Sequence, residues 1–293
     1  MTAELRVDPL TGRMVAMAPG RSERPGASAP SFDPVTDEEL ESCPFCEGRE
    51  NRTPPETLAL PSAGREPNTP GWSVRVVPNK YPAFERQEVV VHAPFHARSI
   101  VELGDPQLEL VAEAWRLRAA AARTEGFEHV FACVNEGSAG GASLMHSHSQ
   151  LVWFREQPPV PAAEQGGQGC RLCDYLTQER EDGSRVVLES GGLMLLCPYA
   201  SRAPYECLIA PLEHEGSGFQ SALLGGGLAL AVEALRRLHA LEGPRPANLW
   251  LHEGGHWHLE LLPRLTVFAS VELGAGHYVN ILRPEVAAGA LRA

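Results

Sequence analysis

One pattern of cysteines and histidines occurs twice along this chain, and it constrains the fold more than any other feature. Each copy contains a CxxC pair, then a single histidine, then an HxH pair. The first copy comprises Cys43, Cys46, His96, His146 and His148, and the second comprises Cys170, Cys173, His214, His256 and His258. Within each copy, the number of residues from the cysteine pair to the single histidine nearly equals the number from that histidine to the HxH pair. Because chance rarely repeats both order and spacing, we interpret the chain as an internal duplication.

The two copies also share a succession of predicted elements. In the first, residues 73–77, 88–92, 130–134 and 151–154 have the composition of strands, and 108–122 has apolar residues at helical spacing. In the second, residues 185–188, 193–196, 206–210, 248–252 and 258–262 are predicted strands, and 222–241 is a predicted helix. We therefore expect an α+β fold of two tandem units, each with an antiparallel sheet and one long helix. The two units should pack against one another as one duplicated structure.

The division between the units is marked by composition. Residues 157–169 (QPPVPAAEQGGQG) are rich in Pro, Gly and Gln and are predicted to form a linker. This places the first unit at residues 1–156 and the second at 170–293. Segment 19–37 is rich in Pro and Ser, and it and segment 54–70 are expected to be irregular.

Composition excludes several classes of protein. The 293 residues carry a formal net charge of −12, which argues against a nucleic-acid partner because phosphate backbones attract basic proteins. A local cluster of donors for a small anionic ligand is compatible with this charge. The N-terminal residues lack the basic start and apolar core of a signal peptide, and no apolar stretch is long enough to span a bilayer. We therefore expect a cytoplasmic protein with no membrane partner.

The repeated cysteines and histidines suit two metal sites. A CxxC pair supplies two thiolates from one tight turn, and two later imidazoles complete a tetrahedral zinc site. The predicted ligand sets are Cys43, Cys46, His96 and His146, and Cys170, Cys173, His214 and His256. Four protein ligands leave no open position, so both sites are predicted to be structural. His252 and His258 compete with His256 for the second site, and a thioredoxin-like redox pair is the alternative interpretation of each CxxC.

The HxH of the first copy follows a segment dense in small residues, 135–143 (NEGSAGGAS). Glycine lets a backbone approach a phosphate closely and offer its N–H groups to it. Asn135, Gly137 and Gly141 are therefore candidate substrate-binding residues.

His148 is the candidate nucleophile. Alternate residues of a strand share a face, so His146, His148 and Gln150 should point the same way, beside the predicted metal site. An imidazole has a pKa near 6.5, so a useful fraction is unprotonated at neutral pH and can attack phosphorus. Gln150 does not titrate and could hold phosphoryl oxygens without acting as a general acid.

The order HxHxQ after a Gly/Ser-rich loop, preceded by CxxC, resembles the galactose-1-phosphate uridylyltransferase family of the histidine-triad superfamily. Other segments extend the resemblance along nearly the whole chain: 8–13 with the following arginines, 77–82, and 272–280. In that family the corresponding segments lie near the nucleotide and the hexose phosphate. The resemblance therefore implies that substrate is bound by Arg21, Arg24, Asn79, Tyr278 and Asn280.

The resemblance also implies a fold, a cofactor and a reaction. Each half should be a histidine-triad-like unit, the first of them catalytic, in a homodimer that contains Zn. A nucleotide sugar should give its nucleoside monophosphate to His148, and a sugar 1-phosphate should then accept it. Ser143 and Gln150 should contact the transferred phosphoryl group. The second HxH has Glu260 where the first has Gln150, so the second half is predicted to be structural.

Three alternatives stay open. Ser147 stands where typical uridylyltransferases have Pro, and together with two CxxC pairs it resembles the ADP-glucose phosphorylase-like branch, an adenylyltransferase with phosphate as acceptor. Hydrolysis is disfavoured because nucleotide hydrolases of the superfamily carry a third histidine where Gln150 stands. The alternative from another class is a non-catalytic, zinc-stabilised nucleotide-binding protein.

Overall fold

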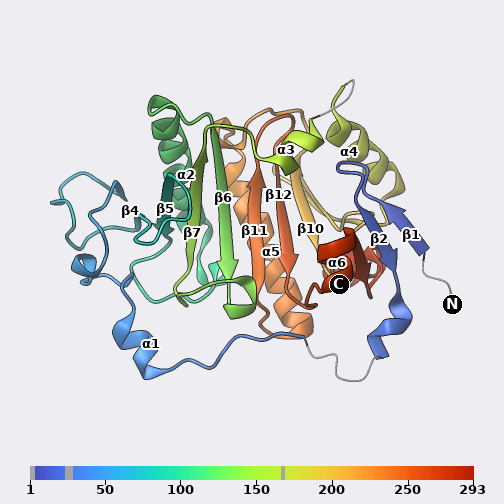
Figure 1. The fold of residues 1–293 in the computed structure, drawn as a ribbon, viewed down its shortest axis with the longest axis horizontal. Helices are drawn as coiled ribbons and strands as arrows, with labels where there is room; N and C mark the ends of the chain where they lie inside the picture. Colours follow the sequence, from blue (N-terminus) through green and yellow to red (C-terminus); the bar gives the residue numbers. More distant parts are fainter. Residues whose placement is uncertain (1–3, 24–28, 166–168) are drawn as a thin grey trace.

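The computed structural model describes residues 4–23, 29–165 and 169–293, in which one large sheet dominates (Figure 1). Ten strands of these residues are hydrogen-bonded into this sheet, and each neighbouring pair is antiparallel. In spatial order they are β3 (Leu58–Leu60), β4 (Val74–Pro78), β5 (Arg86–Val91), β7 (His148–Phe154), β6 (His129–Glu136), β11 (Ala247–His252), β12 (His258–Pro263), β10 (Cys207–Pro211), β9 (Leu193–Leu196) and β8 (Val186–Ser190).

The sheet consists of two halves with mirrored strand order. The succession β4–β5–β7–β6 of the first half corresponds to β9–β10–β12–β11 of the second, and β6 meets β11 at the centre. Residues 133–136 pair with residues 247–250 across this junction. The expected α+β class with duplicated units is confirmed. What the sequence did not predict is that the two sheets join edge to edge through backbone hydrogen bonds.

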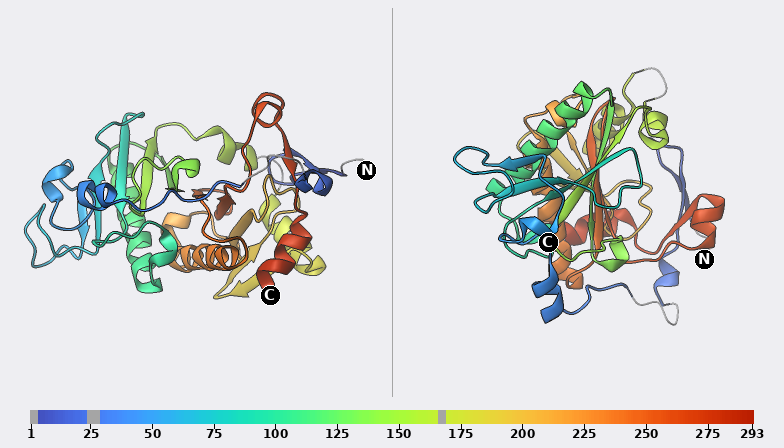
Figure 2. Two further views of the ribbon diagram at one scale, coloured as in Figure 1. Left: turned by 90° about the horizontal axis from the view of Figure 1, so that it is seen from below. Right: turned by 60° about the vertical axis from the view of Figure 1, so that its left-hand side comes forward.

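The long helices cover one face of the sheet. α2 (Asp105–Thr124) and α5 (Leu224–Glu242) pack together below it in Figure 2, left, and α7 (Pro284–Arg292) lies against β8 and α5. Burying apolar surface between helices and sheet is the main stabilising term, roughly 2–3 kcal/mol for each large side chain. Trp115 of α2 is fully buried, and its Nε1 donates to Ser149 Oγ at 2.8 Å. Ser149 therefore points to the helices, and its neighbours His148 and Gln150 point to the opposite face.

Shorter elements surround the opposite face and the edges. They are α1 (Asp37–Ser42), α3 (Pro159–Glu164), α4 (Arg171–Asp182), α6 (Ser270–Ala275) and the 3-10 turns η1 (Pro19–Glu23), η2 (Glu50–Arg52), η3 (Ile100–Glu102), η4 (Ser138–Gly140) and η5 (Gly218–Gln220). α4 packs Leu172 and Leu176 against Leu208 of β10. In the first half, Phe45 of the cysteine turn packs in a cluster with Trp72. Polar side chains, among them His148 and Gln150, occupy the middle of this face.

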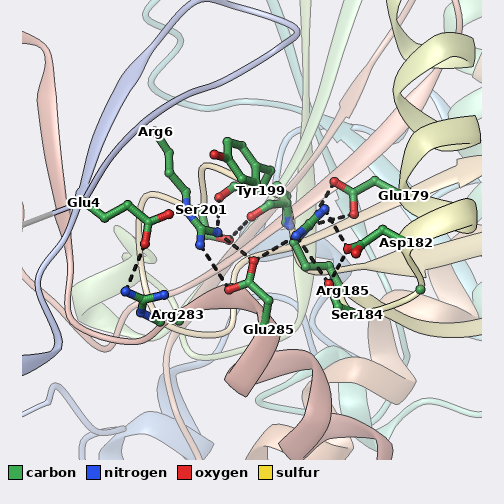
Figure 3. A network of polar contacts seen from close by, with 12 residues as sticks. Glu4, Arg6, Glu179, Asp182, Ser184, Arg185, Tyr199, Ser201, Arg283 and Glu285 are labelled. Atoms are coloured by element: carbon green, nitrogen blue, oxygen red, sulfur yellow. Dashed lines mark hydrogen bonds and ion pairs between the residues drawn. The ribbon is translucent and has the colours of Figure 1, made fainter.

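A second, smaller sheet joins the N-terminus to the second half. It has the order β1 (Glu4–Val7), β2 (Met14–Met17) and β13 (His277–Asn280), with β2 and β13 parallel. Ion pairs anchor it, as Figure 3 shows. Arg6 is 5% exposed and donates to Glu285 at 2.8 Å and to the Tyr199 carbonyl at 3.0 Å, while Arg185 donates to the same carboxylate at 2.9 Å.

Most predicted elements are observed within a few residues of the expected bounds. The prediction was incomplete for β1, β2, β3, β13 and the short helices, which lack the length or periodicity that gives a sequence signal. Part of the predicted linker is helical, since α3 occupies residues 159–164. Among the described residues, none of the helices combines the length and apolarity needed to cross a bilayer.

Candidate functional site

Four of the predicted ligands converge in the first half. The donor atoms of Cys43, Cys46, His96 and His146 all lie within 4.8 Å of one another. His146 Nδ1 is 3.3 Å from Cys43 Sγ and 3.7 Å from Cys46 Sγ, and His96 Nδ1 is 3.5 Å from Cys46 Sγ. A tetrahedral zinc ion would separate such sulfur and nitrogen atoms by roughly 3.5 Å. The group can therefore hold a metal ion without rearrangement.

Outer contacts orient both imidazoles of this first cluster. His146 Nε2 lies 3.0 Å from the Ala93 carbonyl, so Nε2 carries the proton and Nδ1 presents a lone pair to the thiols. His96 Nε2 lies 3.0 Å from Glu39 Oε1. A carboxylate or carbonyl behind each ligating histidine is the usual arrangement at zinc sites, where it fixes the tautomer and raises ligand basicity.

The second predicted set converges as well. The donor atoms of Cys170, Cys173, His214 and His256 lie within 4.8 Å of one another, and Cys173 Sγ is 3.3 Å from Nδ1 of both histidines. This CxxC opens a helix, since Cys170 is the N-cap of α4. His252 and His258 are not in this cluster but in a third group with Glu164 and Glu260.

One cysteine of each cluster is a poor thiolate without a cation. Burial and the adjacent Cys43 raise the pKa of Cys46 to about 11, and burial and the adjacent Cys170 raise the pKa of Cys173 to about 11. A redox-active CxxC requires the opposite shift. Two thiols held together with two imidazoles instead suit a metal ion, which would supply the positive charge that deprotonates them.

His148 has the arrangement of a nucleophile. Its Nδ1 lies 2.6 Å from the His146 carbonyl oxygen, which can only accept, so Nδ1 carries the proton and Nε2 has a free lone pair. Burial lowers the pKa of His148, although the bond to His146 acts in the other direction. The ring is 6% exposed and lies 5.4 Å from the ring of Phe45. His148 is thus held neutral, with Nε2 available.

Gln150 lies on the same face, two residues along β7. Its Oε1 accepts a hydrogen bond of 2.6 Å from Gln87 Nε2 on β5. Beside it on β6 is Cys133, and burial raises the pKa of this thiol to about 12, so it does not compete as a nucleophile. Gln150 Nε2 has no hydrogen-bond partner among residues 4–23, 29–165 and 169–293.

The Gly-rich segment forms a tight turn between β6 and the histidines. Gly137 and Gly141 have φ of 70° and 87°, which favour glycine, and a Cβ at Gly137 would lie 2.8 Å from Pro246 Cβ. Asn135 Oδ1 accepts from Asn248 Nδ2 at 2.7 Å across the β6–β11 junction. Ser143 is exposed at the end of this turn.

The remaining predicted substrate-binding residues are separated in space. Asn79 is in the turn after β4, where its Oδ1 accepts from Tyr81 N at 2.9 Å. Arg21 is exposed on η1, which follows β2, and Tyr278 lies on β13 of the smaller sheet. The smaller sheet is at the other end of the molecule from β4 in Figure 1. Asn280 is buried, and its Nδ2 donates to the Ser201 carbonyl at 2.9 Å. Arg24 lies outside the described residues.

The second half places a different set of side chains at the equivalent positions. His258 faces the carboxylates of Glu164 and Glu260, each 3.9 Å from its Nε2. Burial alone would lower the pKa of His258, but these two carboxylates raise it. Glu260 also forms an ion pair with Arg202, whose guanidinium lies 5.1 Å from the centre of the Trp250 ring.

One cavity lies in the second half of the chain and not at His148. It measures about 490 Å³ and lies beside the second cluster, against Cys170, His214, His256 and Glu164. His148 and the NH2 group of Gln150 nevertheless lie on one face of β7, beside the glycine turn, and combine a nucleophile with a donor for a phosphoryl oxygen. We therefore take the face around His148 as the candidate active site.

Known proteins share this organisation. The family model for the N-terminal domain of galactose-1-phosphate uridyl transferase matches residues 79–159, which contain His148 and Gln150. The galactose-1-phosphate uridylyltransferase of Thermotoga maritima is 27% identical over 99% of this chain and 98% of its own length. The chain is thus similar along nearly its whole length to the galactose-1-phosphate uridylyltransferase family. It is accordingly an enzyme of the nucleotidyltransferase class.

Two further comparisons are with ADP-glucose phosphorylases of Arabidopsis thaliana. The ADP-glucose phosphorylase of Arabidopsis thaliana is 27% identical over 99% of this chain and 92% of its own length. The crystal structure of an ADP-glucose phosphorylase from the same plant with bound ADP-glucose superimposes with a TM-score of 0.82, at 26% identity over 99% of both chains. The chain is therefore similar, through both of its halves, to a protein named galactose-1-phosphate uridylyltransferase and to proteins named ADP-glucose phosphorylase.

Several residues around the uridylyltransferase-like site had not been singled out from the sequence. Phe45 lies inside a CxxC, and its contact with His148 depends on how that turn packs. Gln87 and Asn248 reach the site through strand pairing across 63 and 113 residues of chain. Aligning the two copies strand by strand would have drawn attention to Gln87, because the equivalent residue of the second copy, Glu206, is also polar.

Proposed function

We propose that this nucleotidyltransferase carries a nucleoside monophosphate on His148 Nε2 between a nucleotide sugar and a phosphate-bearing acceptor. The observation that carries this proposal is the 2.6 Å contact of His148 Nδ1 with the His146 carbonyl, which leaves Nε2 as the only basic nitrogen of the ring. Burial, which keeps the imidazole neutral, supports the same role.

The reaction has two displacements. In the first, Nε2 attacks the phosphorus that bears the nucleoside, an N–P bond forms, and the P–O bond to the sugar 1-phosphate breaks. In the second, a phosphate oxygen of the acceptor attacks the same phosphorus, and the N–P bond breaks to restore His148. Gln150 Nε2 would donate to the phosphoryl oxygens. Gly137 and Gly141 would let the backbone of the turn approach the phosphate closely, with Ser143 at the edge of the same turn. Asn135 would line the nucleotide side.

Two substrate pairs are candidates. The first is a uridine nucleotide sugar with a hexose 1-phosphate as acceptor, as in the relatives named galactose-1-phosphate uridylyltransferase. The second is ADP-glucose with inorganic phosphate, which the likeness to the Arabidopsis ADP-glucose phosphorylase structure favours. Ser147 between the histidines supports the second pair.

We assign Zn²⁺ to the two cysteine–histidine clusters, because their donor sets and spacings fit a closed tetrahedral site. Residues 1–156 and 170–293 would then be two metal-stabilised units, with 157–169 between them. A homodimer would explain why Arg21 and Tyr278 lie away from His148, since a second copy could contribute them. Leu5, Val267 and Leu273, 60–77% exposed near the smaller sheet, would be covered by that copy, which sedimentation measurements would detect.

The test is intact-protein mass after incubation with UDP-glucose, UDP-galactose, ADP-glucose and GDP-mannose separately. We expect one nucleoside monophosphate per chain from a single donor, which identifies the base. His148→Ala should abolish the adduct, whereas the matched change His258→Ala should retain it. No adduct from folded, metal-loaded protein with any donor would refute the proposed function.

A further inference from the structure

The side-chain amide of Gln150 can present either of two chemically opposite groups to a phosphoryl oxygen. Its NH2 would donate a hydrogen bond, whereas its carbonyl oxygen would repel the negative charge. Because the amide is nearly symmetric in shape, packing alone does not select between the two orientations. A hydrogen-bond partner of fixed polarity is needed.

The structure contains such a partner at the end of a short chain of contacts. The backbone N–H of Ala83 lies 3.0 Å from Gln87 Oε1, and a backbone N–H can only donate. The oxygen of the Gln87 amide must therefore face Ala83, and its NH2 must face the other way. That NH2 lies 2.6 Å from Gln150 Oε1, so the Gln150 NH2 is directed away from Gln87.

The backbone around Gln87 supports this arrangement. Gln87 O accepts from Asn79 N at 2.8 Å, so the turn of residues 79–83 closes directly on β5. The β5–β7 ladder runs through Gln87 by its backbone, paired with Val152, so the strand does not need this side chain to form. Gln87 is half-buried, and its amide bridges the turn and Gln150.

In the second half, carboxylates occupy the two positions that are equivalent to Gln87 and Gln150. Val89 pairs with Gln150 and Leu208 with Glu260. Gln87, two residues before Val89, therefore corresponds to Glu206, two residues before Leu208 and just ahead of β10. The backbone N of Arg202 donates to Glu206, as that of Ala83, also four residues earlier, donates to Gln87. A carboxylate has no proton to pass on, and the guanidinium of Arg202 lies between Glu206 and Glu260 instead. The turn is duplicated, but only the first half can hold an amide in one polarity.

We propose that Gln87 is a positioning residue, which fixes the amide of Gln150 so that its Nε2 donates to the phosphoryl group transferred to His148. The inference rests on the proposed function for the role of Gln150. It extends that function by naming the group that sets the polarity of the site.

Two variants of Gln87 distinguish this role from simple packing. Gln87→Glu keeps the size and the bond from Ala83 N, but its carboxylate accepts from Gln150 and turns the carbonyl of Gln150 toward the phosphate. Gln87→Met keeps similar size and leaves the Gln150 amide free to rotate. We expect the rate constant of His148 nucleotidylation to fall about 10- to 100-fold in Gln87→Glu and only about two- to fivefold in Gln87→Met. A packing role predicts the reverse order.

The experiment is rapid-quench mass analysis of single-turnover adduct formation over a series of donor concentrations. The half-saturating donor concentration should change less than about threefold, because the loss is confined to the transition state. Gln178→Glu, on the exposed surface of α4, is the control for added charge and should match the wild type. Equal rates for Gln87→Glu and the wild type, or a larger loss in Gln87→Met, would overturn the inference.

A second measurement decides the orientation whether or not an adduct forms. The side-chain NH2 resonance of Gln150 in the holoprotein is assigned by its loss in Gln150→Ala. Its hydrogen exchange should be fast in the wild type and slower in Gln87→Glu, where the NH2 gains an acceptor. A protected Gln150 NH2 in the wild type would overturn the inference. Absence of any adduct from the wild type would refute only the proposed function.

Discussion

The two halves of this chain share a backbone plan and differ in the charge of the side chains on it. His148 and His258 occupy equivalent positions at the starts of β7 and β12. Within the described part of the chain the first has no carboxylate partner, and its pKa is lowered, whereas the second lies between Glu164 and Glu260 and has a raised pKa. A raised pKa favours the imidazolium, which has no lone pair on Nε2, so the first histidine is the better suited of the two to attack phosphorus.

The same contrast continues along the neighbouring strands. Gln87 and Gln150 form a neutral pair in the first half, and Glu206 and Glu260 form a charged pair around Arg202 in the second. The guanidinium occupies the space between two carboxylates and satisfies them internally. The second half thus fills this position with its own cation, whereas the first half has two neutral amides there.

Metal removal should reveal the largest difference between the halves. Cys43→Ser and Cys173→Ser should each lose one metal equivalent and at least about 5 kcal/mol of unfolding free energy. Only Cys43→Ser should also slow adduct formation, because His146 holds the Nδ1 proton of His148 through its carbonyl. Metal analysis, calorimetry and adduct rates test this. Equal loss of activity in the two variants would contradict the division into active and structural halves.

An intermediate effect is expected when the second half is made to resemble the first. Glu260→Gln removes one of two carboxylates from the buried Arg202 and should lower the unfolding free energy by about 2–4 kcal/mol. The stoichiometry of nucleotide should stay at one per chain, because Glu164 still lies beside His258. Urea unfolding measures the free energy of unfolding, and intact-protein mass measures the number of nucleotides bound per chain. A second adduct would mean that Glu260 alone suppresses a nucleophile.

The smallest effect on stability is expected at two glutamates at the ends of the central strands, Glu136 at the end of β6 and Glu253 just after β11. Glu136 accepts from Ser99 Oγ at 2.8 Å and Ile100 N at 2.5 Å, and Glu253 accepts from Ser217 Oγ and from Gly218 N at 2.8 Å. Burial raises the pKa of Glu136 to about 7 against these bonds, and it raises that of Glu253 as well.

A raised folded pKa adds stability at low pH that is lost as pH rises from about 4.5 to about 7. Glu136→Gln should therefore gain roughly 1–3 kcal/mol relative to the wild type between pH 5.5 and 8. Glu253→Gln should gain less, since Arg123 lies 3.7 Å from that carboxylate. Urea unfolding at both pH values measures the difference. A constant difference across this range would show that Glu136 is ionised throughout.

The sequence alone determined the duplication, the strand and helix order and the proposed ligand sets. These depend on periodicity and on residue types that recur at similar spacing, and such signals are local or repeated. The smaller sheet was not predicted, because the strands β1, β2 and β13 are four residues each and pair across the length of the chain. Their place depends on the buried ion pairs of Arg6 and Glu285 rather than on any local pattern.

Only the tertiary structure decided which histidine is neutral and which way the amides point. His146 and His256, like His148 and His258, are indistinguishable as HxH motifs. Their difference comes from Glu164, Arg202 and Gln87, which pairing and packing bring from distant positions. Charge and hydrogen-bond polarity depend on distances of a few ångströms in space, whereas these residues are far apart along the sequence. Gln150 and Glu260 had already distinguished the two halves in the sequence, and the fold shows the contacts by which these residues make the two sites differ.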